Sequence, residues 1–341
     1  MTASVRLGRP AAVVRRRLGL GPGPRKTWIR RNAPEIAADA VDDGVRGAWR
    51  PDRIVRSGTS VMIAMLRRDT DGRRCVVKVP GSADGIAGLR RQDQVLADLH
   101  SDVRLAGWPG MPPRRLGQGE VAGHAYWVED ALPGTPVTPA TLRARGVLAA
   151  AARLVADLHT RPGSRCTLTE PLARSHVEGR IGRLAAHPVA GGPHGPVLAR
   201  LGAEVTSVLT GRATRTCWIH GDFWPGNLLA DQDTVTGVVD WDQAGPAELP
   251  LHDLLHLHVL ARRMQTGAEL GELVVRCLDR GVAATVGVTA EQVDDWFDGV
   301  PERTAVLLYW LRHVSLFIDS EGHGDNPRWL RANIERVLGH V

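Results

Sequence analysis

Two neighbouring stretches of the sequence decide the fold: CWIHGDFWPGNLL at Cys217–Leu229 and GVVDWD at Gly237–Asp242. Each contains a short apolar run of the kind that forms a buried strand, and each run leads into an aspartate. Asp222 and Asn227 stand five residues apart across a Pro-Gly turn. A loop of that size can aim a carboxylate and a carboxamide into one cleft.

The polar side chains of these stretches suit phosphate chemistry. Asn227 and Asp240 supply a neutral and a charged oxygen, the hard ligands that Mg²⁺ prefers when it also holds nucleotide phosphates. Asp222 is then available to accept a proton from an attacking hydroxyl. A lone Asp-Gly or Gly-Asn pair indicates only a turn, but His-x-Asp-x₄-Asn followed by Val-Val-Asp is a joint pattern that chance rarely produces. The set therefore favours a catalytic segment.

The same residues resemble the catalytic and metal-binding segment of the aminoglycoside phosphotransferase and choline kinase-like family, whose members are relatives of the protein kinases. The resemblance extends over roughly residues 51–341, although only the motif segments are specific. It implies that Asp222 is the catalytic base and that Asn227 and Asp240 hold Mg²⁺. It also implies that Asp253, in His252-Asp253-Leu254, braces the catalytic loop.

Residues further upstream resemble the nucleotide site of this family. Lys78, one of only two lysines among 43 basic residues, stands where the family keeps its phosphate-binding lysine. The resemblance places a loop over the phosphates at Gly58-Thr59-Ser60, where small and hydroxyl residues allow close approach to an anion. It places the adenine-binding hinge at Tyr126–Ala131, with Asp130 and Ala131 as the backbone contacts. The implied cofactors are ATP, with GTP as an alternative, and Mg²⁺.

One position departs from the family pattern. Family members usually carry a glutamate on the helix of the first lobe that pairs with the strand lysine, but here Gln92 stands at that position. Gln92 can hydrogen-bond Lys78 but supplies no charge. The departure raises an alternative function, a catalytically impaired pseudokinase that acts as a nucleotide-binding or scaffold protein. Trp224, at a position that is often small or polar, fits a role in acceptor access and a role in packing equally well.

Hydrophobic periodicity separates a β-rich part from a helical part. It predicts strands at 53–57, 61–67, 75–79 and 124–129 and a helix near 86–99. From Thr138 the spacing becomes helical, with helices around 197–210, 251–264, 269–279 and 301–318 and short strands at 217–220 and 235–240. We expect an α+β, two-lobed protein kinase-like fold with a small antiparallel β lobe and a larger mainly helical lobe. The predicted domains are a basic, partly disordered extension (1–50), a nucleotide-binding lobe (51–132) and a catalytic and substrate lobe (133–341).

The net charge of +6 belongs to the N-terminal segment, because residues 1–31 hold nine cations and no acid. Contact with nucleic acid or an anionic membrane is one interpretation of this segment, but a solvated tail is favoured. Apolar stretches are too short for a transmembrane segment. The four cysteines show no CxxC spacing and predict neither a zinc site nor a disulfide framework. We therefore expect a cytoplasmic protein.

The sequence thus predicts a phosphotransferase that uses ATP and Mg²⁺ to move the γ-phosphoryl group to a hydroxyl of a small molecule. The acceptor is an aminoglycoside, a sugar-like or an amino-alcohol metabolite, and the oligomeric state stays open. An acidic helix face after the Thr289/Gln292 capping box could bind a polycation, but a solvated face is the favoured interpretation. His252, His256 and His258 are attributed to local packing and not to a metal site.

Overall fold

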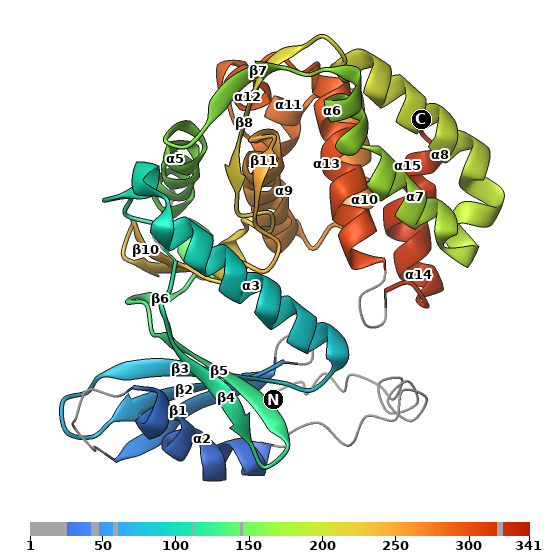
Figure 1. Ribbon diagram of the computed structural model, residues 1–341. Helices are drawn as coiled ribbons and strands as arrows, with labels where there is room; N and C mark the ends of the chain where they lie inside the picture. Colours follow the sequence, from blue (N-terminus) through green and yellow to red (C-terminus); the bar gives the residue numbers. More distant parts are fainter. Residues whose placement is uncertain (1–25, 42–47, 57–60, 111, 144–145, 319–322) are drawn as a thin grey trace. The chain divides into compact units, whose positions relative to one another are not determined.

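The structure, a computed structural model, describes residues 26–41, 48–56, 61–110, 112–143, 146–318 and 323–341. The predicted phosphate loop of Gly58, Thr59 and Ser60 lies outside the described residues, as does most of the basic segment 1–31. The chain divides into two compact units, Met1–Asp93 with Pro113–Ala131 and Gln94–Pro112 with Leu132–Val341. Figure 1 labels most helices and strands of both units.

The first unit contains a five-stranded antiparallel sheet with the strand order β1-β2-β3-β5-β4. Its strands are β1 (Trp49–Arg56), β2 (Val61–Arg68), β3 (Arg74–Pro80), β4 (Arg115–Val121) and β5 (His124–Asp130). Two helices accompany them, α2 (Lys26–Ala40) and α3 (Ala83–Ser101). The predicted Asp71-Gly72 turn joins β2 to β3, and Gly72 adopts a positive φ of 74° there.

The two faces of this sheet have different partners, because successive side chains of a strand point to opposite faces. Cys75, Val77 and Val79 of β3 are fully buried in the core that α2 shares with the sheet. The opposite face packs against the first turns of α3. Lys78 falls between Val77 and Val79, so the period of two directs the predicted phosphate-binding lysine to the α3 face.

Helix α2 begins inside the segment that the sequence predicts to be an extension. Ile29, Ala33, Ile36 and Ala37 recur at helical spacing, and each is buried against the sheet. The cations of this segment suggest a solvated tail. The helical spacing of these four apolar residues, however, decides that the segment packs on the sheet. The exact limits of the three predicted domains stay a prediction.

The second unit is mainly helical and contains two small sheets, ordered β10-β9-β6 and β11-β8-β7. After η1 (Val103–Leu105) its elements up to the second sheet are β6 (Thr135–Pro136), α4 (Pro139–Arg143), α5 (Gly146–Thr160), β7 (Ser164–Thr167), α6 (Glu170–Ser175), α7 (Glu178–Ala186), α8 (Pro188–Leu209), β8 (Ala213–Ile219), η2 (Pro225–Asn227), β9 (Leu228–Asp231), β10 (Thr234–Val238) and β11 (Gly245–Glu248). The remaining elements are α9 (Leu251–Thr266), α10 (Leu270–Arg280), α11 (Val282–Val286), α12 (Ala290–Phe297), α13 (Glu302–Phe317), α14 (Pro327–Leu330), η3 (Arg331–Glu335) and α15 (Arg336–Leu338).

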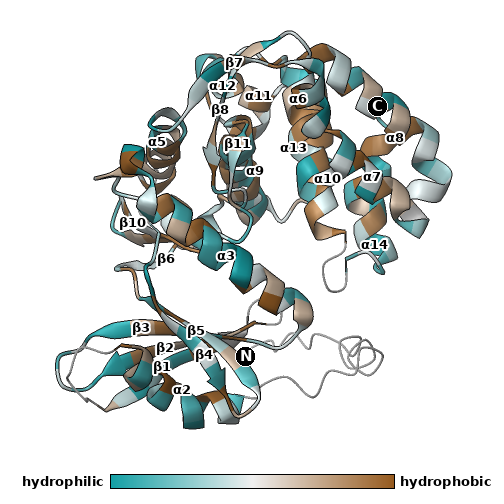
Figure 2. Ribbon diagram, viewed as in Figure 1, coloured by the Kyte–Doolittle hydropathy of each residue, from teal (hydrophilic) through white to brown (hydrophobic). Residues whose placement is uncertain are grey.

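One large hydrophobic core holds the second unit together. Helices α9 and α13 are buried along most of their length, and both lie close to the predicted helix limits of 251–264 and 301–318. Hydrophobic residues, brown in Figure 2, recur along α5 and α13. The buried faces of α9 and α13 also contain polar residues, among them Asp253, His256 and Arg312. These polar residues belong to the site described below.

The predicted α+β architecture, with a small antiparallel β part and a larger helical part, is confirmed. Among the described residues, no helix is long and apolar enough to cross a membrane. All four cysteines are free thiols. Burial raises the pKa of Cys75 and of Cys277 to about 12, so these two thiols stay protonated and unreactive near neutral pH.

Candidate active site

The segment that the sequence singles out forms a tight loop between β8 and β9. His220, Gly221 and Asp222 directly follow β8, and Asn227 ends the short turn η2. Gly221 adopts a φ of 82°, and a Cβ on this residue would stand 2.1 Å from the carbonyl oxygen of Gln243. Both the backbone conformation and the close approach therefore require glycine.

Asp253 of α9 holds the backbone of this loop. Its carboxylate accepts the backbone N–H groups of His220 at 2.7 Å and Gly221 at 2.8 Å, and it accepts Nε2–H of His159 at 3.1 Å. Burial raises the pKa of Asp253, but the bond from His159, the charges around the carboxylate and the backbone bond outweigh burial and keep the pKa below its ordinary value. An ionised Asp253 therefore braces the loop.

Arg312 of α13 fixes the loop from a second helix. Its Nη1 donates to the carbonyl of Gly221 at 2.5 Å, and its Nη2 donates to the carbonyl of Gln243 at 3.0 Å. The N–H of Gly221 is held by α9 and its C=O by α13. Because both peptide groups are tied to buried helices, the direction in which Asp222 leaves the backbone is fixed.

Both carboxylate oxygens of Asp222 accept a hydrogen bond. His256 Nε2 lies 2.9 Å from Oδ1, and Asn227 Nδ2 lies 2.9 Å from Oδ2. The side chain of Asp222 is 19% exposed, so it is not sealed in the core. Since each oxygen of a carboxylate has two lone pairs, Asp222 retains capacity to accept a proton from a hydroxyl.

The backbone brings the two predicted metal ligands together. Val239, which precedes Asp240, donates its N–H to the carbonyl of Asn227 at 3.0 Å. The Nδ2 group of Asn227 donates to Asp222 at the backbone carbonyl and at Oδ2, so the amide oxygen of Asn227 is left outside these two bonds. Asp240 is exposed and adopts a φ of 70°, a region that few residues other than glycine enter. An amide oxygen and an exposed carboxylate fit a hard cation that takes further oxygen ligands elsewhere.

His220 forms hydrogen bonds both to the segment of Asp222 and to the segment of Asp240. Its Nδ1 accepts the N–H of Asp222 at 3.2 Å, so its Nε2–H donates to the carbonyl of Val239 at 3.1 Å. Burial lowers the pKa of His220, which keeps the ring neutral and preserves this donor and acceptor pattern. The ring also packs on Trp241, with 4.4 Å between centroids.

In the first unit, a carboxylate holds Lys78, although the sequence predicts none on α3. Nζ of Lys78 lies 2.9 Å from Oε2 of Glu129, and Gln92 donates Nε2–H to Oε1 of Glu129 at 2.5 Å. All three side chains are buried. Strand β5 therefore supplies the acidic partner that position 92 of α3 does not supply, and Gln92 hydrogen-bonds this acid and not the lysine.

The structure also describes the surroundings of the predicted hinge residues and of Trp224. Asp130 and Ala131 follow Glu129 at the end of β5, and the N–H of Asp130 is already used by the carbonyl of Arg114 at 3.0 Å. An adenine base bound by the backbone of Asp130 would therefore contact the carbonyl group of Asp130. Trp224 is half-buried, packs against the large core and covers Gly226.

The sequence matches the model of the Phosphotransferase enzyme family over residues 55–282, more than half of the chain. The chain belongs to this family. The protein is thus an enzyme that transfers a phosphoryl group to a hydroxyl acceptor, as the sequence predicts. No curated protein matches the sequence.

Solved structures resemble this phosphotransferase in fold. One is a thermostable mutant of aminoglycoside phosphotransferase APH(4)-Ia in ternary complex with AMP-PNP and hygromycin B; it is 14% identical, the match covers 91% of this chain and 98% of that one, and the TM-score is 0.58. Another is ADP-bound aminoglycoside phosphotransferase APH(2'')-Ib, 13% identical, with 89% and 96% covered and a TM-score of 0.52. At these identities the likeness establishes the predicted kinase-like fold.

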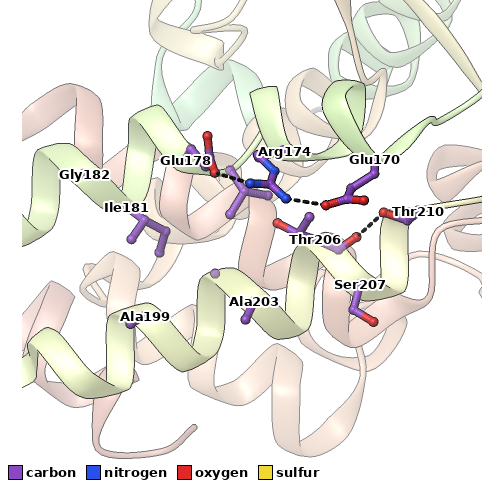
Figure 3. A pocket seen from close by; sticks show the side chains of 12 residues that line it. Glu170, Arg174, Glu178, Ile181, Gly182, Ala199, Ala203, Thr206, Ser207 and Thr210 are labelled. Atoms are coloured by element: carbon purple, nitrogen blue, oxygen red, sulfur yellow. Dashed lines mark hydrogen bonds and ion pairs between the residues drawn. The ribbon is translucent and has the colours of Figure 1, made fainter.

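The phosphotransferase also contains a cavity of about 750 Å³ between α6, α7 and α8 (Figure 3). Arg174 in its wall forms ion pairs with Glu170 and Glu178, so its positive charge is offset by these carboxylates. Its lining is otherwise mostly small or apolar, and none of its residues belongs to the catalytic segment. The cavity is therefore separate from the catalytic segment.

Sequence reasoning missed two residues of the site. The sequence places Glu129 in the hinge and attributes His256 to packing. The spacing offers a signal for His256, because it follows Asp253 by three residues and thus lies on the same face of α9. No comparable signal exists for Glu129, since its pairing with Lys78 depends on which strands are neighbours.

Proposed function

We propose that this phosphotransferase uses ATP and Mg²⁺ to phosphorylate a hydroxyl group of an aminoglycoside, a sugar-like metabolite or an amino alcohol. The observation that carries the proposal is the arrangement of Asp222, whose carboxylate is fixed by Asn227 and His256 yet retains lone pairs and partial exposure. AMP-PNP and hygromycin B are bound by a solved phosphotransferase of the same fold, which supports a nucleotide and a small-molecule acceptor here.

Each proposed role matches the chemistry of the side chain. Lys78 carries a compact ammonium, positioned by Glu129, that suits the α- and β-phosphates. Asn227 and Asp240 would hold Mg²⁺, which when bound neutralises charge on the phosphate oxygens. Asp222 orients the acceptor hydroxyl and accepts its proton as the oxygen attacks the γ-phosphorus in line with the leaving ADP oxygen.

The alternative of an impaired pseudokinase was raised by Gln92. The ion pair between Lys78 and Glu129 removes the main reason for it, because the lysine has a buried carboxylate partner. Lys78, Asp222, Asn227 and Asp240 are all of the residue type that transfer requires.

The test is ATP turnover with a panel of hydroxyl-bearing aminoglycosides, sugars and amino alcohols. Asp222→Asn removes the proton acceptor while preserving shape, and Asp231→Asn, an exposed aspartate at the end of β9, is the matched control. We expect transfer to at least one acceptor class, a loss of about 10²–10⁴-fold in Asp222→Asn and none in Asp231→Asn. ATP binding without transfer to any acceptor would support the pseudokinase instead.

A further inference from the structure

Asp222 has a histidine partner that takes no part in the proton transfer of the proposed mechanism. His256 Nε2 lies 2.9 Å from Oδ1 of Asp222, and the histidine side chain is only 3% exposed. An ionised carboxylate has no proton to give, so Nε2 of His256 must be the donor. His256 therefore bonds the same carboxylate that accepts the proton in the proposed function.

A second layer of residues fixes the orientation of His256. The hydroxyl of Tyr309 on α13 lies 3.1 Å from its Nδ1. Burial raises the pKa of Tyr309 well above its usual value, so the phenol keeps its proton and remains a donor. The ring of His313, one turn further along α13, packs on the ring of His256 with 4.0 Å between centroids. A bond at each nitrogen and a packed face leave the imidazole one orientation.

Burial alone does not explain these contacts. His258 lies two residues further along α9 and is similarly buried, but neither of its ring nitrogens has a hydrogen-bond partner among the described residues. Its ring stacks on Trp296, with 4.5 Å between centroids. The same helix thus offers one histidine that only packs and another with both nitrogens engaged, one of them by Asp222.

We propose that His256 is a positioning residue that, together with Tyr309, sets the plane of the Asp222 carboxylate against the acceptor hydroxyl. His256 holds Oδ1 and Asn227 holds Oδ2, so two donors on opposite oxygens leave the remaining lone pairs in fixed directions. This inference rests on the proposed role of Asp222 as the base. A misplaced base slows the transfer step without weakening nucleotide binding, since a displacement of about 1 Å costs about 10²-fold in rate.

Three variants separate positioning from packing. His256→Leu fills the space without a donor, His256→Gln retains an N–H near the position of Nε2, and His258→Leu is the matched control on the same helix. We expect His256→Leu to lower kcat about 10–100-fold with the KM for ATP within about twofold, and His256→Gln to recover most of the loss. His258→Leu should retain the kcat of the wild type. If His256→Leu fails to fold, the histidine NMR signal of the wild type and of Asp222→Ala serves as the test instead.

A readout independent of turnover keeps the two proposals apart. In ¹⁵N-histidine NMR spectra of the full chain, we expect a protonated, hydrogen-bonded Nε2 on His256 whose signal moves in Asp222→Ala. Wild-type kcat in His256→Leu, or an unprotonated Nε2, would overturn the inference and leave the proposed function intact. If the wild type phosphorylates no acceptor, the proposed function fails, whereas an Nε2 signal that responds to Asp222→Ala would still support the positioning contact.

Discussion

Lys78 is held by an acid from the strand beside it. Lys78 and Trp127 are paired in register on β3 and β5, and Glu129 stands two residues further along on the same face of the sheet. The sequence predicts the lysine correctly as a strand residue, but its partner depends on strand neighbours that no local pattern reveals. His256 differs, because its spacing from Asp253 on α9 places it on the face toward the loop, but its bond to Asp222 joins residues 34 positions apart.

At the residue scale, moving the carboxylate from Glu129 on β5 to position 92 on α3 tests the role of Glu129. Glu129→Gln leaves a buried ammonium without a carboxylate, which we expect to destabilise the first unit by about 3 kcal/mol and to weaken ATP binding. Gln92→Glu combined with Glu129→Gln returns one carboxylate to the same cluster. This double variant should restore much of the stability and much of the ATP binding. Calorimetric melting and ATP titration measure the two effects.

The exposed Glu120 of β4 provides the control, and Glu120→Gln should change neither quantity. If the double variant is no better than Glu129→Gln alone, the carboxylate is required on β5 itself and not merely within the cluster.

At the element scale, periodicity predicts the long helices and the strands with apolar alternation. It misplaces the start of α8, expected at 197 but found at Pro188, because Pro193 and Pro196 argue against a helix interior. Buried Ala190, Leu198 and Leu201 show that packing decides that helix. Strand β4 is absent from the sequence prediction, since its glycines and polar residues give no apolar alternation.

Gly221, in the loop between β8 and β9, has a matched counterpart in Gly211, which lies between α8 and β8. Gly221 and Gly211 have nearly the same φ, 82° and 81°, but a Cβ at Gly221 would meet the carbonyl of Gln243, whereas nothing lies within 4 Å at Gly211. Gly211→Ala should cost about 1 kcal/mol and leave kcat unchanged. Gly221→Ala should cost more and lower kcat about 10²-fold, since it must displace Arg312 or Gln243.

Thermal melting and kcat of the two variants provide the measurement. Equal losses of kcat at both positions would show that backbone conformation, and not the contact with α13, sets the rate.

At the scale of the whole molecule, buried histidines make the fold sensitive to acid. Burial lowers the pKa of His220, His252, His258 and His313, and for His258 to about 4. Between pH 6.5 and about 4 the unfolded chain binds a proton at His258 that the folded chain does not bind. The contribution of this neutral histidine to the free energy of unfolding is therefore complete above pH 6.5 and lost as the pH falls.

We expect the melting temperature to fall steeply between pH 6.5 and 4.5. His258→Leu removes one titrating group. It should therefore reduce the acid-dependent loss in the free energy of unfolding by up to about 3 kcal/mol over the full pH window. His194→Leu, a substitution at a partly exposed histidine of α8, is the control and should retain the slope of the wild type. Calorimetry across the pH series checks this, and parallel curves for the wild type and His258→Leu would contradict it.

The ion pair between Lys78 and Glu129 also bears on regulation. In protein kinases the lysine pairs with a glutamate on a helix, and moving that helix turns the enzyme on and off. Here the pair joins β3 to β5, which are adjacent strands of one sheet. Displacing α3 would remove Gln92 from the cluster but leave the salt bridge intact. An enzyme built in this way lacks that switch at its lysine, so its output would follow the supply of nucleotide and acceptor and not a signal acting on the helix.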